Sequence, residues 1–222
     1  MSVPWLLVPA WPAKHAPPDM IFGPVAWEEM MVSIVEMTVV ASLLGVVVLR
    51  SSMLPDAWKK SHEKSHKYSR TSAELLFVAI HNSIVVLLCL ISYLSSTRVG
   101  RNWWALHAFA FEIGYEIFDT VHTNRRLSPD ALIHHICSPV GIITSAFTKA
   151  DVNLLLHLAV CMDASGAWLA ICKLVSRHSK DDSTGAVTKG ALYYRWMLLV
   201  YLPCRVLLPM YDIVFIVSNI SY

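Results

Sequence analysis

The chain has 222 residues, of which 55% are hydrophobic and only 15% are charged, and its formal net charge is +2. A mean hydropathy of +0.51 is too high for a water-soluble domain and is typical of a polytopic membrane protein. The small net charge and the lack of a block of basic and aromatic residues argue against a nucleic-acid partner. The five cysteines are an odd number and lie in apolar segments, so they indicate no disulfide framework.

Apolar segments long enough to cross a bilayer divide the chain, since a spanning helix needs about 20 mostly apolar residues. Residues 1–26 are proline-rich and lack the basic stretch and long apolar core of a cleaved signal peptide. After them we predict six membrane helices, at 27–49, 72–94, 103–122, 129–147, 152–174 and 193–217. The sequence therefore predicts an all-α polytopic membrane bundle over residues 27–217, followed by a short tail at 218–222.

The loop charges predict the orientation of these helices. Twelve Lys and Arg residues lie in the connections after the first, third and fifth helices, against four on the opposite side. Because positively charged loops stay in the cytosol, this bias predicts that the basic loops are cytosolic and that both termini are lumenal.

The fourth predicted helix has a clear start signal. Ser128 is a favourable N-cap residue, Pro129 fits the first helical position, and Asp130 adds a negative charge to the first turn. We therefore expect this helix to begin directly after Ser128.

An acidic stripe lies inside the third predicted helix. Glu112, Glu116 and Asp119 stand at positions i, i+4 and i+7, so they share one helix face. A single ionised carboxylate at mid-bilayer costs on the order of 2.5–3.5 kcal/mol, and such residues normally face a bundle interior or a polar cavity. The same helix carries two further polar side chains near this face, Tyr115 and His122. We expect the stripe to line a functional site, where a carboxyl group could donate or accept a proton.

The pair His134-His135 follows the acidic stripe after one short turn. Adjacent helical residues point about 100° apart, so only one imidazole can fully address a given cavity. One histidine could act as a general base or nucleophile while the other anchors a helix, with Asp163 and Asp119 as the acids that orient them. The structural alternative is that both are core histidines with satisfied hydrogen bonds.

Polar residues in the last two predicted helices could complete the same site. Asp163 and Ser165 lie in the fifth helix, and Arg205 lies in the sixth. A buried Arg needs anions, so Arg205 could pair with the acids or bind the phosphate or carboxylate of a lipid. The alternative is that Arg205 and Asn82 make only structural polar contacts with the acids.

A metal centre is another chemistry that acids and histidines in a helical bundle can support. The sequence has one D-x-x-H motif, at Asp119 and His122, without a second copy. Ala131 stands where an H-x-x-H-H motif would need its first histidine. The histidines of the predicted helices are scattered, so we expect no metal ion and no cofactor.

Five short motifs occur in order along residues 70–217. They are S-x(8)-H at Ser72–His81, GYEIFD at 114–119, the pair His134-His135, D-x-S-x(3)-L-x(3)-K at Asp163–Lys173, and R-x(3)-P at Arg205–Pro209. The order and spacing of these motifs resemble those of the TLC-domain family of endoplasmic-reticulum membrane proteins, which includes the ceramide synthases.

This resemblance implies a six-helix bundle that encloses a cavity for a lipid acyl chain. In ceramide synthases the histidine pair is catalytic, and an acyl group moves from acyl-CoA to a sphingoid amine. The matching residues here are His134, His135 and Asp163. The chain has Met162 and Gly166 where the synthases carry a histidine and a second aspartate. GYEIFD is more similar to the branch of the family that is tied to phospholipid composition, lipid trafficking or sensing.

The leading hypothesis is a lipid-handling protein of the endoplasmic reticulum membrane, and it leaves open whether the protein is an enzyme. It would bind an acyl chain, a phospholipid or a sphingoid base, and could transfer an acyl group from acyl-CoA. The residues expected to contact the lipid are His81, Glu112, Tyr115, Glu116, His122, Ser165 and Arg205. The alternatives are a non-enzymatic lipid sensor or trafficking receptor, a proton-coupled transporter and a metal-dependent lipid hydroxylase. The protein could also be a homodimer.

Overall fold

The computed structural model describes residues 27–52, 54–56, 70–123, 128–147, 152–178, 195, 198–208, 210–211 and 214. Several predictions fall outside these described residues: the N-terminal segment 1–26, the tail 218–222, the basic turn with Arg125 and Arg126, most of the loop at 56–70, and Pro209 of the last motif.

Every regular element in the described ranges is a helix, and these ranges contain no strand. The elements are α1 (Trp27–Arg50), α3 (Ser72–Leu94), α4 (Arg98–Thr123), α5 (Pro129–Phe147), α6 (Val152–His178) and the short π-helix η3 (Pro203–Leu207). Helical residues also flank η3, so the described part of the sixth predicted helix falls within its expected range. The all-α prediction is therefore confirmed, and the main difference is that α4 begins at Arg98 rather than at 103.

Side-chain caps fix where two of these helices begin. Thr71 and Glu74 form a capping box at α3: the Glu74 amide donates to Thr71 Oγ1 over 3.1 Å, and the Thr71 amide donates to the Glu74 carboxylate over 2.6 Å. At α5, the Ala131 amide donates to Ser128 Oγ over 3.4 Å, which confirms Ser128 as the N-cap. Both caps satisfy amides that have no partner within the helix.

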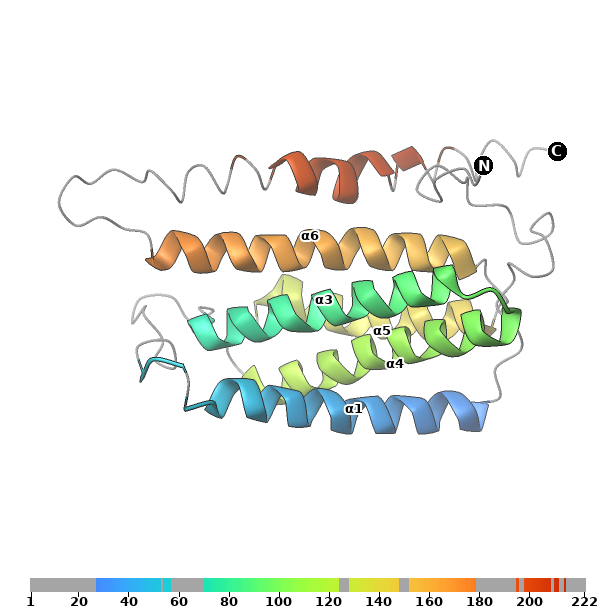
Figure 1. Ribbon diagram of the computed structural model, residues 1–222, viewed down its shortest axis with the longest axis horizontal. Helices are drawn as coiled ribbons and strands as arrows, with labels where there is room; N and C mark the ends of the chain where they lie inside the picture. The colour runs from blue at the N-terminus through green and yellow to red at the C-terminus, as the bar shows by residue number, and fades with distance from the viewer. Residues whose placement is uncertain are drawn as a thin grey trace.

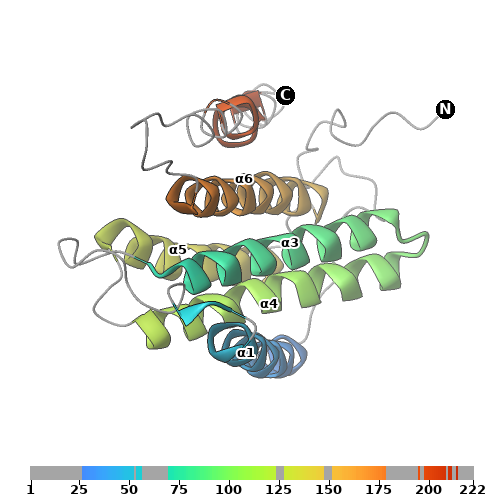
Figure 2. The same cartoon turned by 60° about the vertical axis from the view of Figure 1, so that its left-hand side comes forward.

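The helices lie roughly along one direction and pack as an extended bundle (Figure 1). The most extensive contacts join α3 to α6, α1 to α4 and α3 to α4. The helix α5 contacts α4, and it lies behind α3 in the rotated view (Figure 2). The C-terminal helical residues lie on the far side of α6, where η3 contacts that helix. Four helices, α3 to α6, therefore surround a common interior.

Glycines set the closest approaches between these helices. A Cβ atom at Gly114 would lie 2.6 Å from the Thr38 amide nitrogen and 2.8 Å from the Met37 carbonyl carbon, both in the backbone of α1. At Gly166 of α6, a Cβ atom would collide with the Asn82 side chain of α3. Small residues let membrane helices approach closely and gain van der Waals contact. Gly114 and Gly166 therefore hold α1 and α6 against the two central helices.

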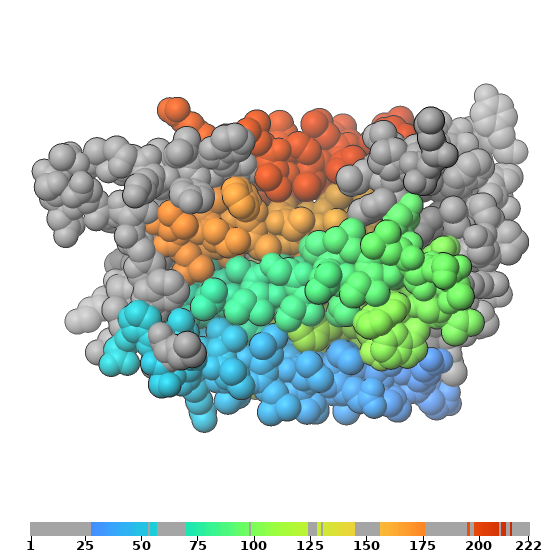
Figure 3. All heavy atoms as spheres, in the orientation of Figure 1, coloured from blue at the N-terminus to red at the C-terminus, as the bar shows by residue number. Residues whose placement is uncertain are grey.

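The outer surface of the bundle is apolar. One face of α1 exposes large aliphatic side chains, namely Val32, Val35, Val39, Leu43 and Val47, and this helix forms the blue band in Figure 3. Three described helices are long and apolar enough to cross a membrane by length and composition: Glu28–Arg50, Ser72–Leu94 and Leu156–Val175. The helix α4 is not among them, since it carries three acids that face inward. An apolar exterior with polar residues inside is what a bilayer selects.

Candidate functional site

A cavity of about 620 Å³ lies between α3, α4, α5 and α6. Apolar side chains make up much of its wall, including Leu75, Val85, Phe109, Ile142 and Leu169. Its polar lining residues come from these four helices, from the residue before the N-cap of α3 and from η3: Arg70, Asn82, Glu112, Tyr115, His134, His135, Ser138, Asp163, Lys173 and Arg205. The combination of an apolar wall and a small set of converging polar groups is typical of a ligand pocket.

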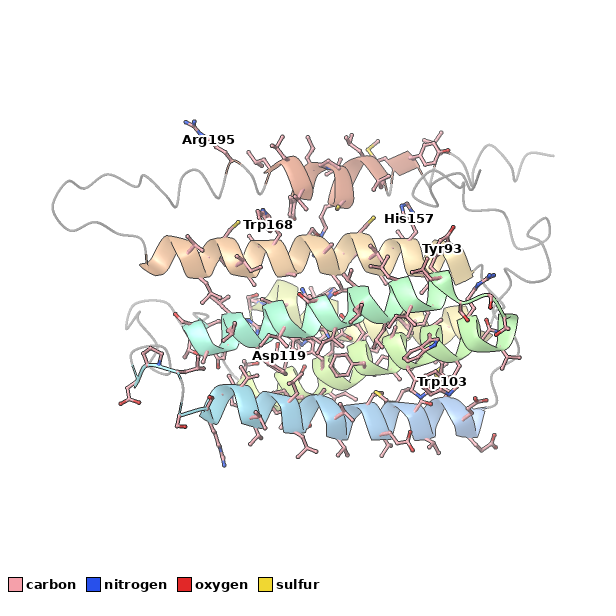
Figure 4. The ribbon with its side chains drawn as sticks, viewed as in Figure 1. Tyr93, Trp103, Asp119, His157, Trp168 and Arg195 are labelled. Atoms are coloured by element: carbon pink, nitrogen blue, oxygen red, sulfur yellow. The ribbon has the colours of Figure 1, made fainter. Side chains whose placement is uncertain are left out.

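The first polar cluster joins Arg70, Asp119 and His135. The Arg70 guanidinium donates two hydrogen bonds to the Asp119 carboxylate, over 2.8 Å and 2.6 Å. His135 Nε2 lies 3.5 Å from Asp119 Oδ2, and His135 Nδ1 lies 2.9 Å from Thr120 Oγ1. Asp119 is 3% exposed, so this bidentate pairing supplies the cation that a buried carboxylate needs. In Figure 4, Asp119 lies toward the opposite end of α4 from Trp103.

The second cluster joins the other two acids of α4 to histidines. His134 Nε2 lies 3.4 Å from Glu116 Oε1, and His81 Nε2 lies 3.0 Å from Glu112 Oε2. His134 is about half exposed, whereas Glu116 is 1% exposed. The two imidazoles come from α5 and α3, so α4 is paired with helices on both sides of the cavity.

The His81 ring is fixed by its neighbours. It stacks on Tyr115, with ring centroids 3.7 Å apart, and its Nδ1 lies 2.8 Å from the Asn82 amide group. The amide of Asn82 is best satisfied when its nitrogen donates to His81 Nδ1 and to the Val78 carbonyl. This assignment leaves the proton of His81 on Nε2, where it faces the Glu112 carboxylate.

The third cluster lies between α6 and η3. Arg205 Nε donates to Ser165 Oγ over 2.7 Å, and its Nη2 donates to the Met162 carbonyl over 3.0 Å. The π-helical turn begins at Pro203 and contains Arg205. Asp163 also lines the cavity and is 7% exposed. Arg205 is therefore held by a hydroxyl and a carbonyl of α6, next to Asp163.

The structure brings most of the predicted site residues to this cavity. Glu112, Tyr115, His134, His135, Asp163 and Arg205 line it directly. Behind this lining, in contact with it, lie His81, Glu116, Asp119 and Ser165.

His122 is the predicted site residue that lies elsewhere. It contributes with Glu74 to a separate pocket of about 270 Å³, and its Nε2 lies 3.7 Å from Glu74 Oε1. His157 is also outside the cavity lining. It lies with Trp168 on the side of α6 that faces the C-terminal helical residues, and Arg195 points away from the bundle (Figure 4).

Arg70 is the site residue that the sequence did not predict. It was considered there only as one of the basic residues of the loops. The available signal was its position, one residue before the N-cap of α3. A cation is disfavoured at the positive end of a helix dipole, so an arginine there implies a nearby acid. The sequence could not indicate which acid.

The family model described as the TLC domain matches residues 26–222, which is most of the chain and includes α1. Searches among curated proteins and among solved structures gave no significant match. The match extends from α1 through every element that lines the cavity. The chain therefore belongs to the TLC-domain family, a family of membrane proteins associated with lipid metabolism and homeostasis.

Proposed function

We propose that this protein binds the acyl chain of a membrane lipid in the cavity between α3, α4, α5 and α6. The observation that carries the proposal is the composition of the cavity wall, in which aliphatic and aromatic side chains surround a few converging polar groups. Its volume of about 620 Å³ is within the roughly 300–1,000 Å³ of ligand pockets. Each buried methylene contributes about 0.8 kcal/mol, so an acyl chain is a favourable occupant of such a wall. We further propose that the protein resides in the endoplasmic reticulum with both termini in the lumen.

The polar end of the cavity is suited to acyl transfer. In this proposal the Thr120 hydroxyl orients the His135 ring through Nδ1, and Nε2, which lies 3.5 Å from Asp119 Oδ2, acts as the general base. It takes a proton from an amine or hydroxyl of the acceptor, whose heteroatom attacks the carbonyl of an acyl-CoA thioester. The C–S bond breaks, and the thiol leaves with that proton. The sphingoid amine of the ceramide synthases is one acceptor of this class.

A non-enzymatic lipid carrier or sensor is the second candidate, and the pairing of the acids favours it. Asp119 is neutralised by Arg70, Glu112 faces His81, and the described hydrogen bonds of Arg205 go to α6. Side chains engaged in this way also serve to hold a bundle together. Lipid binding is common to both candidates, and turnover separates them.

Filling the cavity tests lipid binding. Gly141 of α5 lines the cavity, and a Cβ atom there would meet no other atom within 4 Å. Gly141→Leu should therefore fold but lower the amount of co-purified lipid by about tenfold, equivalent to about 1.4 kcal/mol of binding free energy. Native mass spectrometry of gently purified protein measures this, with Gly141→Ala as the matched control. Equal lipid on wild type and Gly141→Leu would contradict binding in this cavity.

A histidine variant tests acyl transfer. In cells that lack the protein, wild type should restore the lipid composition, whereas His135→Ala should not, although it still co-purifies with lipid. A general base contributes about 10²–10⁴-fold to a rate, so the loss should be close to complete. His107→Ala is the control, since His107 contacts the Trp103 carbonyl of its own helix and lies outside the cavity lining. Full rescue by His135→Ala would support the carrier or sensor instead.

A further inference from the structure

Two carboxylates and one imidazole meet beside the cavity, at the boundary between α4 and α5. One ligand-type atom from each of Glu112, Glu116 and His134 lies within 4.8 Å of the other two. Glu112 and Glu116 stand one helical turn apart on α4, and His134 approaches from α5. Spacing of i and i+4 on one helix lets two side chains bind the same ion.

The Glu116 carboxylate lacks hydrogen bonds although it is buried. The residue is 1% exposed, and neither carboxylate oxygen has a hydrogen-bond partner within the described chain. Its polar neighbours are His134 Nε2, at 3.4 Å, and the Ser138 side chain. Oxygen Oε2 of Glu112 likewise makes no regular hydrogen bond, although it lies 3.0 Å from His81 Nε2. Buried polar groups are normally satisfied, so the two oxygens of Glu116 call for a positive partner.

The distance between Glu116 and His134 suits a transition-metal ion, and the third ligand atom lies within 4.8 Å of both. Ligand atoms about 2.1 Å from one Zn²⁺ in tetrahedral geometry stand roughly 3.4 Å apart. Glu116 Oε1 and His134 Nε2 are 3.4 Å apart. Two carboxylates would balance the charge of a divalent ion, and His81 would act as the outer hydrogen-bond donor that orients a ligating carboxylate.

From these observations we propose that Glu112, Glu116 and His134 form a binding site for a divalent transition-metal ion of the Zn²⁺, Mn²⁺ or Fe²⁺ class. Imidazole combined with carboxylates is a donor set that such ions accept. Both Glu112 and His134 line the cavity, so the open side of the ion would face it. There the ion would supply a Lewis acid next to the bound ligand. The site uses none of the groups that hold His135, so it goes beyond the proposed function and does not depend on it.

Metal content tests this proposal directly. Purified, tag-free protein is treated with EDTA, incubated separately with Zn²⁺, Mn²⁺ or Fe²⁺, desalted and measured by inductively coupled plasma mass spectrometry. We expect about one ion per chain for wild type with at least one of these metals, and about a tenfold or greater loss for Glu116→Gln and His134→Ala. Glu36→Gln is the matched control, since Glu36 is an exposed acid on α1, and it should bind as wild type does.

Thermal unfolding provides a second readout that separates a lost site from a lost fold. Without metal, Glu116→Gln should melt at or above the wild-type temperature, because it removes a buried carboxylate without hydrogen bonds. The metal should raise the melting temperature of wild type and of Glu36→Gln but not of Glu116→Gln.

Two results would overturn the proposal. One is wild-type protein that retains none of the three metals. The other is equal retention by wild type and Glu116→Gln, which would assign the metal to other histidines, such as His62 and His66. A protein that binds lipid but no metal would keep the proposed function and lose only this site.

Discussion

Acids of α4 lie opposite basic groups that come from other segments of the chain. Asp119 is bound by Arg70, Glu112 faces His81, and Glu116 faces His134. Within a bilayer the pairings of Asp119 and Glu112 reduce the cost of an ionisable group, and all three contacts link α4 to a neighbouring segment. The polar residues therefore serve both the cavity and the stability of the bundle.

Removing Arg70 should destabilise the fold. Arg70→Ala leaves Asp119 buried without its guanidinium partner, and breaking a buried pair in this way costs roughly 3 kcal/mol. Thermal unfolding in detergent measures the loss. Arg50→Ala, at the exposed end of α1, should change stability by less than about 0.5 kcal/mol. Adding Asp119→Asn to Arg70→Ala should restore part of the stability, and a further decrease would contradict the pairing.

At the scale of the helices, close backbone contacts decide how the elements pack. The central helix α4 contacts α1 at Gly114 and α3 along much of its length. Around the contact of α3 with α4, aromatic rings fill the interior, including Phe77, Phe111 and Tyr115. By contrast, α5 exposes most of its described side chains, and it contacts mainly α4 and less extensively than α3 does. The helix with the histidine pair is therefore the least tightly packed wall of the cavity.

A methyl group at the contact of α1 with α4 should be costly. Gly114→Ala forces a Cβ atom against the backbone of Thr38, which cannot move aside as a flexible side chain would, so we expect a loss of about 1–3 kcal/mol. Gly141→Ala is the matched substitution on α5, where the new Cβ atom meets open space. It should be neutral or stabilise by up to about 1 kcal/mol, because alanine favours a helix. Equal melting temperatures for the two variants would contradict this account of the packing.

The described bundle has an apolar exterior, and its largely apolar interior also holds several ionisable side chains. Exposed aliphatic residues cover α1 and α5, whereas Glu116, Asp119 and Asp163 are buried. Arg70 precedes the N-terminus of α3, and Lys173 lies near the C-terminus of the antiparallel helix α6, so both are at the same end of the bundle. Both residues line the cavity. The cavity therefore reaches the end of the bundle from which the predicted cytosolic loops extend.

The orientation of the bundle can be tested with glycosylation sites. An acceptor sequence introduced within residues 1–26 should be glycosylated completely in microsomes, because the positive-inside bias places that segment in the lumen. The same sequence within the basic loop at 57–69 should remain unmodified. The reverse pattern would show that the loop charges do not set the topology of this protein.

The sequence alone determined the helical class, the approximate positions of the helices and the identity of most of the polar residues around the cavity. These are local properties: apolar length identifies a spanning helix, the i, i+4 and i+7 spacing places three acids on one face, and Ser128 marks a helix start. Only the tertiary structure decided the partners. That Arg70 neutralises Asp119, that His122 lies apart with Glu74, and that Glu112, Glu116 and His134 converge all depend on how helices pack. Helix packing is set by side chains that are distant in sequence, so no local spacing specifies it.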